Sequence, residues 1–174
     1  MIATVYRSTG SWYDITDDAG QPWKARIKGI FKIDGLTSTN PIAVGDVVDF
    51  ELDETSDAIT GTIHHIHERK NYIVRKSVNL SHQMHIIASN VDYVFLLITI
   101  NNPPTTTNFI DRFLVTAEAY GIETILVFNK IDTFDEATLD EQLYLQHIYQ
   151  EIGYQCLRVS STESKGIEAL KQLM

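Results

Sequence analysis

Residues 125–132, Ile-Leu-Val-Phe-Asn-Lys-Ile-Asp, form an apolar run that ends abruptly in polar side chains. Short apolar runs are typical of strands buried on both faces of a parallel sheet, and ligands of such sheets bind where the strands end. A carboxylate there, such as that of Asp132, accepts hydrogen bonds from the ring N–H and the exocyclic amine of guanine, which adenine does not offer in that geometry. The alternative is that Asp132 only caps the following helix.

The segments around this run alternate between strand and helix patterns. We expect buried strands at 91–100, Glu123–Phe128 and 155–160, and helices at 108–120, 135–151 and 166–173. Asn108 is the expected N-cap of the first helix, and Leu145, Ile148 and Ile152 are the expected apolar stripe of the second. This alternation predicts an α/β domain with a parallel sheet and right-handed crossovers.

A second loop follows the next strand, at Ser160-Ser161-Thr162. We expect its backbone N–H groups to reach the guanine carbonyl, Asn129 to brace the neighbouring loops and the Lys130 stem to lie on the base. A phosphate loop requires Gly-x-x-x-x-Gly-Lys-Ser/Thr, yet the chain contains no Gly-Lys dipeptide. The single Asp-x-x-Gly, at Asp17–Gly20, is interpreted as a hairpin turn.

The first 70 residues have the pattern of a small β-barrel. We expect strands at 2–7, 11–16, 23–31, 45–52 and 58–67, which fit a five-stranded OB-type barrel, with an SH3-like barrel as the alternative. Strict alternation in 23–31 predicts one basic face, and its cations are candidates for RNA phosphates: Lys24, Arg26, Lys28 and Lys32. Nearby aromatics either stack on bases or fill the core: Trp12, Tyr13 and Trp23.

Composition narrows the class of protein. The formal net charge of −9 argues against indiscriminate nucleic-acid binding, and 44% hydrophobic residues suffice for a core. With Cys156 as the one cysteine, no internal disulfide or cysteine-based zinc cage forms, and the histidine spacing predicts no metal site. No secretory signal pattern opens the sequence and no apolar run is long enough to span a bilayer. We therefore expect a cytoplasmic monomer.

Several stretches in the same order resemble the ribosome small-subunit-dependent GTPases, the RsgA (YjeQ, EngC) family. They are Val44-Gly45-Asp46-Val47-Val48, Glu68-Arg69-Lys70-Asn71 with Arg75, Ala88-Ser89-Asn90-Val91-Asp92, Phe109-Ile110-Asp111-Arg112-Phe113-Leu114, Phe128-Asn129-Lys130-Ile131-Asp132, and Gly153-Tyr154 before Ser160-Ser161. The family commonly has Ser-Ala where this chain has Ser160-Ser161.

The resemblance implies an RNA-binding OB barrel over 1–70, a connector over 71–90 and, over 91–174, the first half of a circularly permuted GTPase domain. Permutation puts base recognition before the phosphate loop, so Asn129, Lys130, Asp132, Ser160 and Ser161 would bind GTP or GDP, and no catalytic residue lies in the chain. Magnesium would accompany the nucleotide, and zinc would belong to a C-terminal domain beyond Met174. The implied partners are the small ribosomal subunit and its rRNA.

Two alternatives belong to other classes. One is a non-enzymatic RNA-binding or assembly module with a relic nucleotide-binding half, and the other is a scaffold whose acidic second half binds a basic ribosomal protein. A Gly-x-x-x-x-Gly-Lys-Ser soon after Met174 in the gene would favour the enzyme.

Overall fold

The computed structural model describes residues 1–27, 41–53, 59–76 and 84–174. The chain divides into two compact units, Met1–Val91 and Asp92–Met174.

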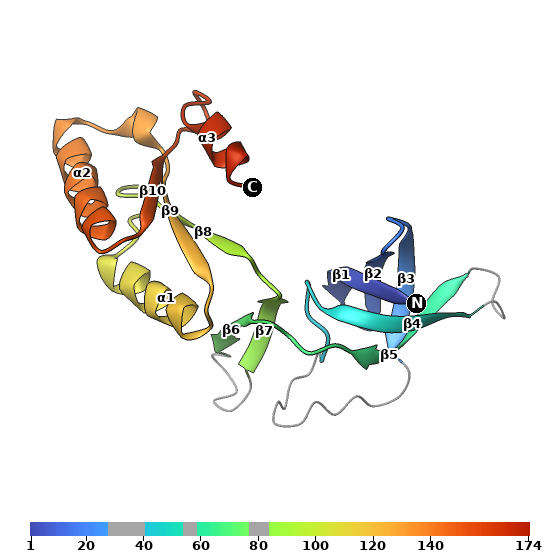
Figure 1. The fold of residues 1–174 in the computed structure, drawn as a ribbon. Coiled ribbons are helices and arrows are strands. Elements are labelled where there is room, and N and C mark those ends of the chain that lie inside the picture. The colour runs from blue at the N-terminus through green and yellow to red at the C-terminus, as the bar shows by residue number, and fades with distance from the viewer. Residues whose placement is uncertain (28–40, 54–58, 77–83) are drawn as a thin grey trace. The chain divides into compact units, whose positions relative to one another are not determined.

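The first unit contains a closed barrel with the strand order β1-β2-β3-β5-β4 (Figure 1). Its strands are β1 (Ile2–Thr9), β2 (Trp12–Asp17), β3 (Pro22–Ile27), β4 (Val47–Asp53) and β5 (Thr60–Ile66). Strands β3 and β5 pair in parallel, while β1 pairs antiparallel with both β2 and β4. A five-stranded barrel in which β4 lies outside sequence order is the Greek-key arrangement of an OB fold, so the predicted barrel class is confirmed.

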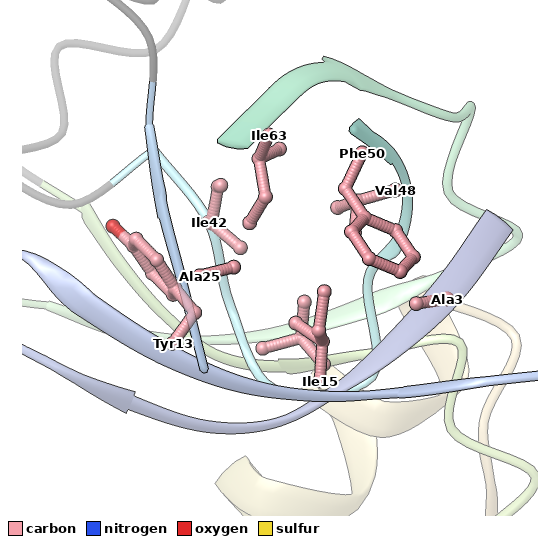
Figure 2. Close-up of a cluster of buried hydrophobic side chains, with 9 residues drawn as sticks. Ala3, Tyr13, Ile15, Ala25, Ile42, Val48, Phe50 and Ile63 are labelled. Carbon is pink, nitrogen blue, oxygen red and sulfur yellow. The ribbon is translucent and has the colours of Figure 1, made fainter. Parts of the chain in front are cut away.

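The barrel interior is filled by alternate side chains of its strands, as Figure 2 shows. Nine buried residues form this core: Ala3, Val5, Tyr13, Ile15, Ala25, Ile42, Val48, Phe50 and Ile63. Because side chains alternate across a strand, the neighbours of Ala25 point outward and are exposed, as the basic alternation predicted.

The Asp17–Gly20 segment is the predicted hairpin turn. One carboxylate oxygen of Asp17 accepts from the backbone N–H of Ala19 at 3.0 Å and of Gln21 at 2.8 Å. The other accepts from Trp23 Nε1 at 3.0 Å.

The expected connector contains two strands that the sequence reading did not identify. β6 (Tyr72–Lys76) and β7 (Met84–Ser89) pair antiparallel within the first unit. Their register shifts between Ile73 and Val74, which interrupts the period-two pattern by which strands are recognised.

A buried carboxylate ties the barrel to this hairpin. Asp46 is fully buried and accepts from Arg69 at 2.7 and 2.6 Å, from the Ser89 hydroxyl at 2.5 Å and from the Ala43 N–H at 2.8 Å. Asn90 Nδ2 adds a hydrogen bond to the carbonyl of Gly45 at 2.8 Å. This Asp46 cluster was not anticipated from the sequence.

The second unit is a three-stranded parallel sheet in the order β10-β9-β8. Its elements are β8 (Tyr93–Ile98), α1 (Thr107–Ala119), β9 (Glu123–Phe128), the short η1 (Ile131–Thr133), α2 (Glu136–Glu151), β10 (Gln155–Arg158) and α3 (Ile167–Gln172). Helices α1 and α2 cover one face and α3 lies on the other (Figure 1). The predicted α/β architecture is confirmed.

Three local predictions for this unit were wrong. Helix α1 is capped by Thr106, whose hydroxyl accepts from the Phe109 N–H, and not by Asn108. Ile148 and Ile152 of the predicted α2 stripe are exposed, and the helix instead buries Thr138, Gln142 and Tyr149. Strand β8 is not buried on both faces, because it lies at the sheet edge and Leu97 is 60% exposed.

Among the described residues, no helix is both long and apolar enough to cross a membrane.

Candidate nucleotide-binding site

Two loops meet at the carboxyl ends of β9 and β10. The Asn129 N–H continues the sheet ladder to the Ile98 carbonyl at 2.8 Å. The Val159 N–H donates to the Phe128 carbonyl at 2.8 Å, and the Ile131 N–H donates back to the Val159 carbonyl at 3.3 Å. The parallel register therefore brings the Asn129–Asp132 loop and the Ser160–Thr162 loop together, as expected for a ligand site in such a sheet.

The backbone of the first loop turns sharply at Lys130. This residue has φ of 66°, a left-handed conformation that residues other than glycine adopt uncommonly and that recurs at functional sites. Asn129 supports the turn because its side-chain oxygen accepts from the Lys130 N–H at 2.8 Å. The Lys130 ammonium donates to the carbonyl of Asn102, in the loop after β8, so Lys130 connects two strand ends.

Asp132 is exposed, and hydroxyl groups of the second loop orient its carboxylate. Thr162 donates to it at 3.0 Å, and the Thr162 and Ser160 hydroxyls lie 3.0 Å apart. Ser160 is fully buried, and its hydroxyl also accepts from the Glu163 N–H at 3.1 Å. Hydrogen bonding by Ser160, and then by Thr162, lowers the pKa of Asp132, so the carboxylate is held ionised.

The two loops also meet through Asn129. The Ser161 hydroxyl lies 3.5 Å from the Asn129 side-chain oxygen, a long hydrogen bond, and Ser161 is exposed. The structure thus brings the predicted residues Asn129, Asp132, Ser160 and Ser161 into one cluster, with Lys130 in the same loop.

The alternative role of Asp132 as a helix cap is not observed. Helix α2 is capped by Asp135, whose carboxylate accepts from the Thr138 N–H at 2.9 Å. Asp132 lies in η1, before that cap, so its carboxylate is not needed to begin the helix.

The contribution of Thr162 was missed by the sequence analysis. Thr162 was expected to contribute only through the backbone N–H groups of its loop, whereas its hydroxyl donates to the Asp132 carboxylate at 3.0 Å. The sequence does contain a signal that could have identified Thr162: it is a hydroxyl residue two positions after Ser160, at the end of a parallel strand.

Two of the four barrel cations predicted to contact RNA lie within the described residues. Lys24 and Arg26 are exposed on β3, whereas Lys28 and Lys32 lie outside the described residues. The three aromatics divide clearly: Tyr13 belongs to the core, Trp23 packs against it, and Trp12 is 43% exposed.

The strand-end cluster fits a guanine base, since it offers an exposed, ionised carboxylate that can accept from the ring N–H and the exocyclic amine. It does not fit a magnesium–phosphate group. Within the described ranges, no three His, Cys, Asp or Glu side chains are grouped so that they could hold a metal ion, and the sequence has no Gly-Lys dipeptide.

An OB-type barrel precedes a parallel α/β sheet, and the Asn-Lys-Ile-Asp loop has no phosphate-loop sequence upstream of it. These features define a class, the circularly permuted GTPases. A family model described as RsgA GTPase matches residues 66–174, and one described as RsgA N-terminal domain matches residues 3–60. The chain belongs to the RsgA GTPase family.

Curated relatives and solved structures agree with this assignment. Proteins named small ribosomal subunit biogenesis GTPase RsgA from Flavobacterium psychrophilum and Flavobacterium johnsoniae are 76% and 74% identical over all 174 residues. The chain covers 53% and 54% of their lengths, so it spans about half of these relatives.

Among solved structures, YjeQ from Thermotoga maritima has a TM-score of 0.76 and 31% identity, over 99% of this chain and 56% of that one. YloQ, described as a circularly permuted GTPase, has a TM-score of 0.67 and 26% identity, over 99% of this chain and 54% of that one.

Proposed function

We propose that the chain supplies guanine recognition and RNA contact to a protein that binds and hydrolyses GTP during maturation of the small ribosomal subunit. One observation carries the nucleotide part: the Asp132 carboxylate is exposed, ionised and oriented by hydroxyls of the neighbouring loop. The names of the relatives, which span about twice the length of this chain, support the cellular role.

In the bound state, the Asp132 carboxylate accepts from the guanine ring N–H and exocyclic amine. The Ser160 N–H already donates to the Lys165 carbonyl at 2.9 Å, so the backbone N–H of Ser161 faces the guanine carbonyl, and the Lys130 stem lies along the base. Adenine would leave the carboxylate and this amide without these partners. Guanine selectivity follows from this mismatch.

The other half of the reaction belongs to residues outside this chain. GTP hydrolysis requires a phosphate cradle and a bound magnesium ion, which neutralises charge on the phosphates. We assign the cradle and magnesium to the part of the full-length protein that follows Met174, together with the zinc that the family resemblance implies. The barrel contacts rRNA phosphates through Lys24, Arg26, Lys28 and Lys32, and the protein acts as a cytoplasmic monomer.

The test compares the full-length protein with the 174-residue chain in a GTP hydrolysis assay. We expect the full-length protein to hydrolyse GTP, faster with small ribosomal subunits present, and to hydrolyse ATP poorly. The 174-residue chain should show no turnover, because its sequence has no Gly-Lys dipeptide and therefore no phosphate loop. Turnover by the short chain, or equal use of ATP and GTP by the long one, would refute the proposal. A full-length protein that binds RNA without nucleotide dependence would favour the relic-domain alternative.

A further inference from the structure

The outer face of β1, β2 and β3 carries a grid of polar side chains around an exposed tryptophan. Strand register places Arg7, Asp14 and Lys24 side by side in one cross-strand row. Thr9 pairs with Trp12 in the next row, and Arg26 completes that row, since its guanidinium lies 4.8 Å from the centroid of the Trp12 ring. Tyr13 and Ala25, which lie between these positions on β2 and β3, point inward to the barrel core.

A shallow groove opens on this face. Five residues line it, and we call it the Trp12 groove: Arg7, Thr9, Trp12, Asp14 and Lys24. Its volume of about 280 Å³ is just below the ~300 Å³ at which pockets for drug-sized ligands begin, which suits a single planar group. Arg26 stacks on the tryptophan without lining the groove.

Barrel stability does not account for Trp12. Tyr13 is buried in the core, and Trp23 packs against that core while donating to Asp17. Trp12, in contrast, remains 43% exposed, and its one described ring contact is the cation of Arg26. An exposed tryptophan that a stacked arginine holds in place is a prepared surface for another flat ring.

Charge on the grid favours an anionic ligand. In the Trp12 groove, Arg7 and Lys24 flank one carboxylate, Asp14, which lies 3.6 Å from Arg7 with both side chains well exposed. Arg26, beside this groove, also lines a second groove with Glu51 and Asp53. Within the described residues, no carboxylate pairs with Lys24 or Arg26, so both remain available to phosphates. The lining of the Trp12 groove is therefore net positive, in contrast to the chain as a whole, whose net charge is −9.

We propose that the Trp12 groove binds one unpaired nucleotide of single-stranded RNA, with the base against Trp12 and the flanking phosphates at Lys24 and Arg7. Oligonucleotide-binding barrels use this strand face and the adjoining loop, and base–aromatic stacking accepts any base. Asp14, at the centre of the groove, accepts from an exocyclic amine and therefore prefers cytosine, adenine or guanine to uracil, which has no such amine. The inference rests on the proposed RNA contact of the barrel and is independent of the guanine site.

The experiment measures fluorescence anisotropy of labelled eight-nucleotide RNAs titrated with the 174-residue chain. Trp12→Ala should weaken binding of oligo(C) by about 5- to 150-fold, the range expected for loss of one stacked base, and Trp12→Phe by less. Tyr144→Ala removes an aromatic that is 67% exposed in the second unit and should change nothing. Lys24→Ala should reduce the salt dependence by about one phosphate contact. Asp14→Asn should abolish the preference for oligo(C) over oligo(U).

The outcomes separate this inference from the proposed function. If Lys24→Ala weakens binding while Trp12→Ala does not, the groove assignment is wrong although the RNA contact stands. If the unsubstituted chain binds no RNA, both the groove and the RNA role of the barrel fail, while guanine recognition is untouched. Equal affinity for duplex RNA would also overturn the proposal. The proposal would likewise be overturned if an acidic peptide displaced the RNA and its own binding depended on Trp12. That result would indicate a protein partner.

Discussion

Replacing Asp46 by alanine tests whether the buried Asp46 cluster holds the first unit together. The side chain is fully buried and accepts four hydrogen bonds, two of them from Arg69. Alanine would leave the guanidinium, whose side chain is only 10% exposed, without its carboxylate. The hydroxyl of Ser89 and the N–H of Ala43 would lose a partner as well.

The expected cost follows from the burial of the pair. Removing one partner of a buried ion pair destabilises a protein by about 3–5 kcal/mol, whereas whole domains are stable by only about 5–15 kcal/mol. For a denaturant slope of about 2 kcal/mol per molar urea, the unfolding midpoint should fall by roughly 2 M. Asp46→Asn keeps the shape and removes the charge, so it should show an intermediate loss.

Urea unfolding followed by tryptophan fluorescence is the appropriate assay. The sequence has 2 tryptophans, Trp12 and Trp23, and both lie in the first unit, so the signal reports on that unit alone. Asp14→Ala is the matched control: its pair with Arg7 is exposed and should contribute less than about 1 kcal/mol. If Asp46→Ala shifted the midpoint no more than Asp14→Ala, the Asp46 cluster would have no stabilising role.

Three further predictions concern single residues. Gly45→Ala should destabilise the first unit by several kcal/mol in the same urea assay, because φ of Gly45 is +89° and a Cβ would collide with the Ser89 carbonyl oxygen. An unfolding midpoint equal to that of the unsubstituted chain would contradict this expected clash. The lowered pKa of Asp132 keeps its carboxylate ionised until the pH falls through that lowered value. Thr162→Val removes a hydrogen-bond donor and should raise the pKa of Asp132 in an NMR titration, whereas the control Thr116→Val on α1 should leave it unchanged. Identical Asp132 titrations in the two variants would exclude the Thr162 contact. Burial raises the pKa of the Cys156 thiol to about 11. At pH 8 the thiol should therefore react slowly with a disulfide reagent until urea unfolds the second unit. Fast reaction in the native chain would disprove this burial.

Local alternation and strand ends were readable from the sequence. The sequence predicts the burial of Ala25 between two exposed cations, and the burial of the apolar run 125–128 before Asn129. Both predictions use burial patterns that involve only near neighbours in the sequence. The positions of Asn129 and Asp132 next to Ser160 also follow from the sequence, because parallel strands end at one edge.

Features that depend on distant pairing were not readable. The parallel pairing of β3 with β5 and the burial of Asp46 against Arg69 each join residues far apart in sequence. The exposure of Ile148 and Ile152 likewise reflects which side of α2 meets the sheet, where Tyr149 is buried instead. The Thr162 hydroxyl belongs to this group, because its role appears only when the two loops are brought together.

Exchange of guanine for xanthine tests most directly whether Asp132 selects the base. In the full-length protein, Asp132→Asn replaces an acceptor by a side chain that also donates, and xanthine carries an oxygen where guanine carries its amine. Asp135→Asn is the control, since asparagine caps a helix as well as aspartate does. We predict that the unsubstituted protein and Asp135→Asn bind GDP more tightly than xanthosine diphosphate, and that Asp132→Asn reverses this order. An unchanged guanine preference in Asp132→Asn would contradict the account.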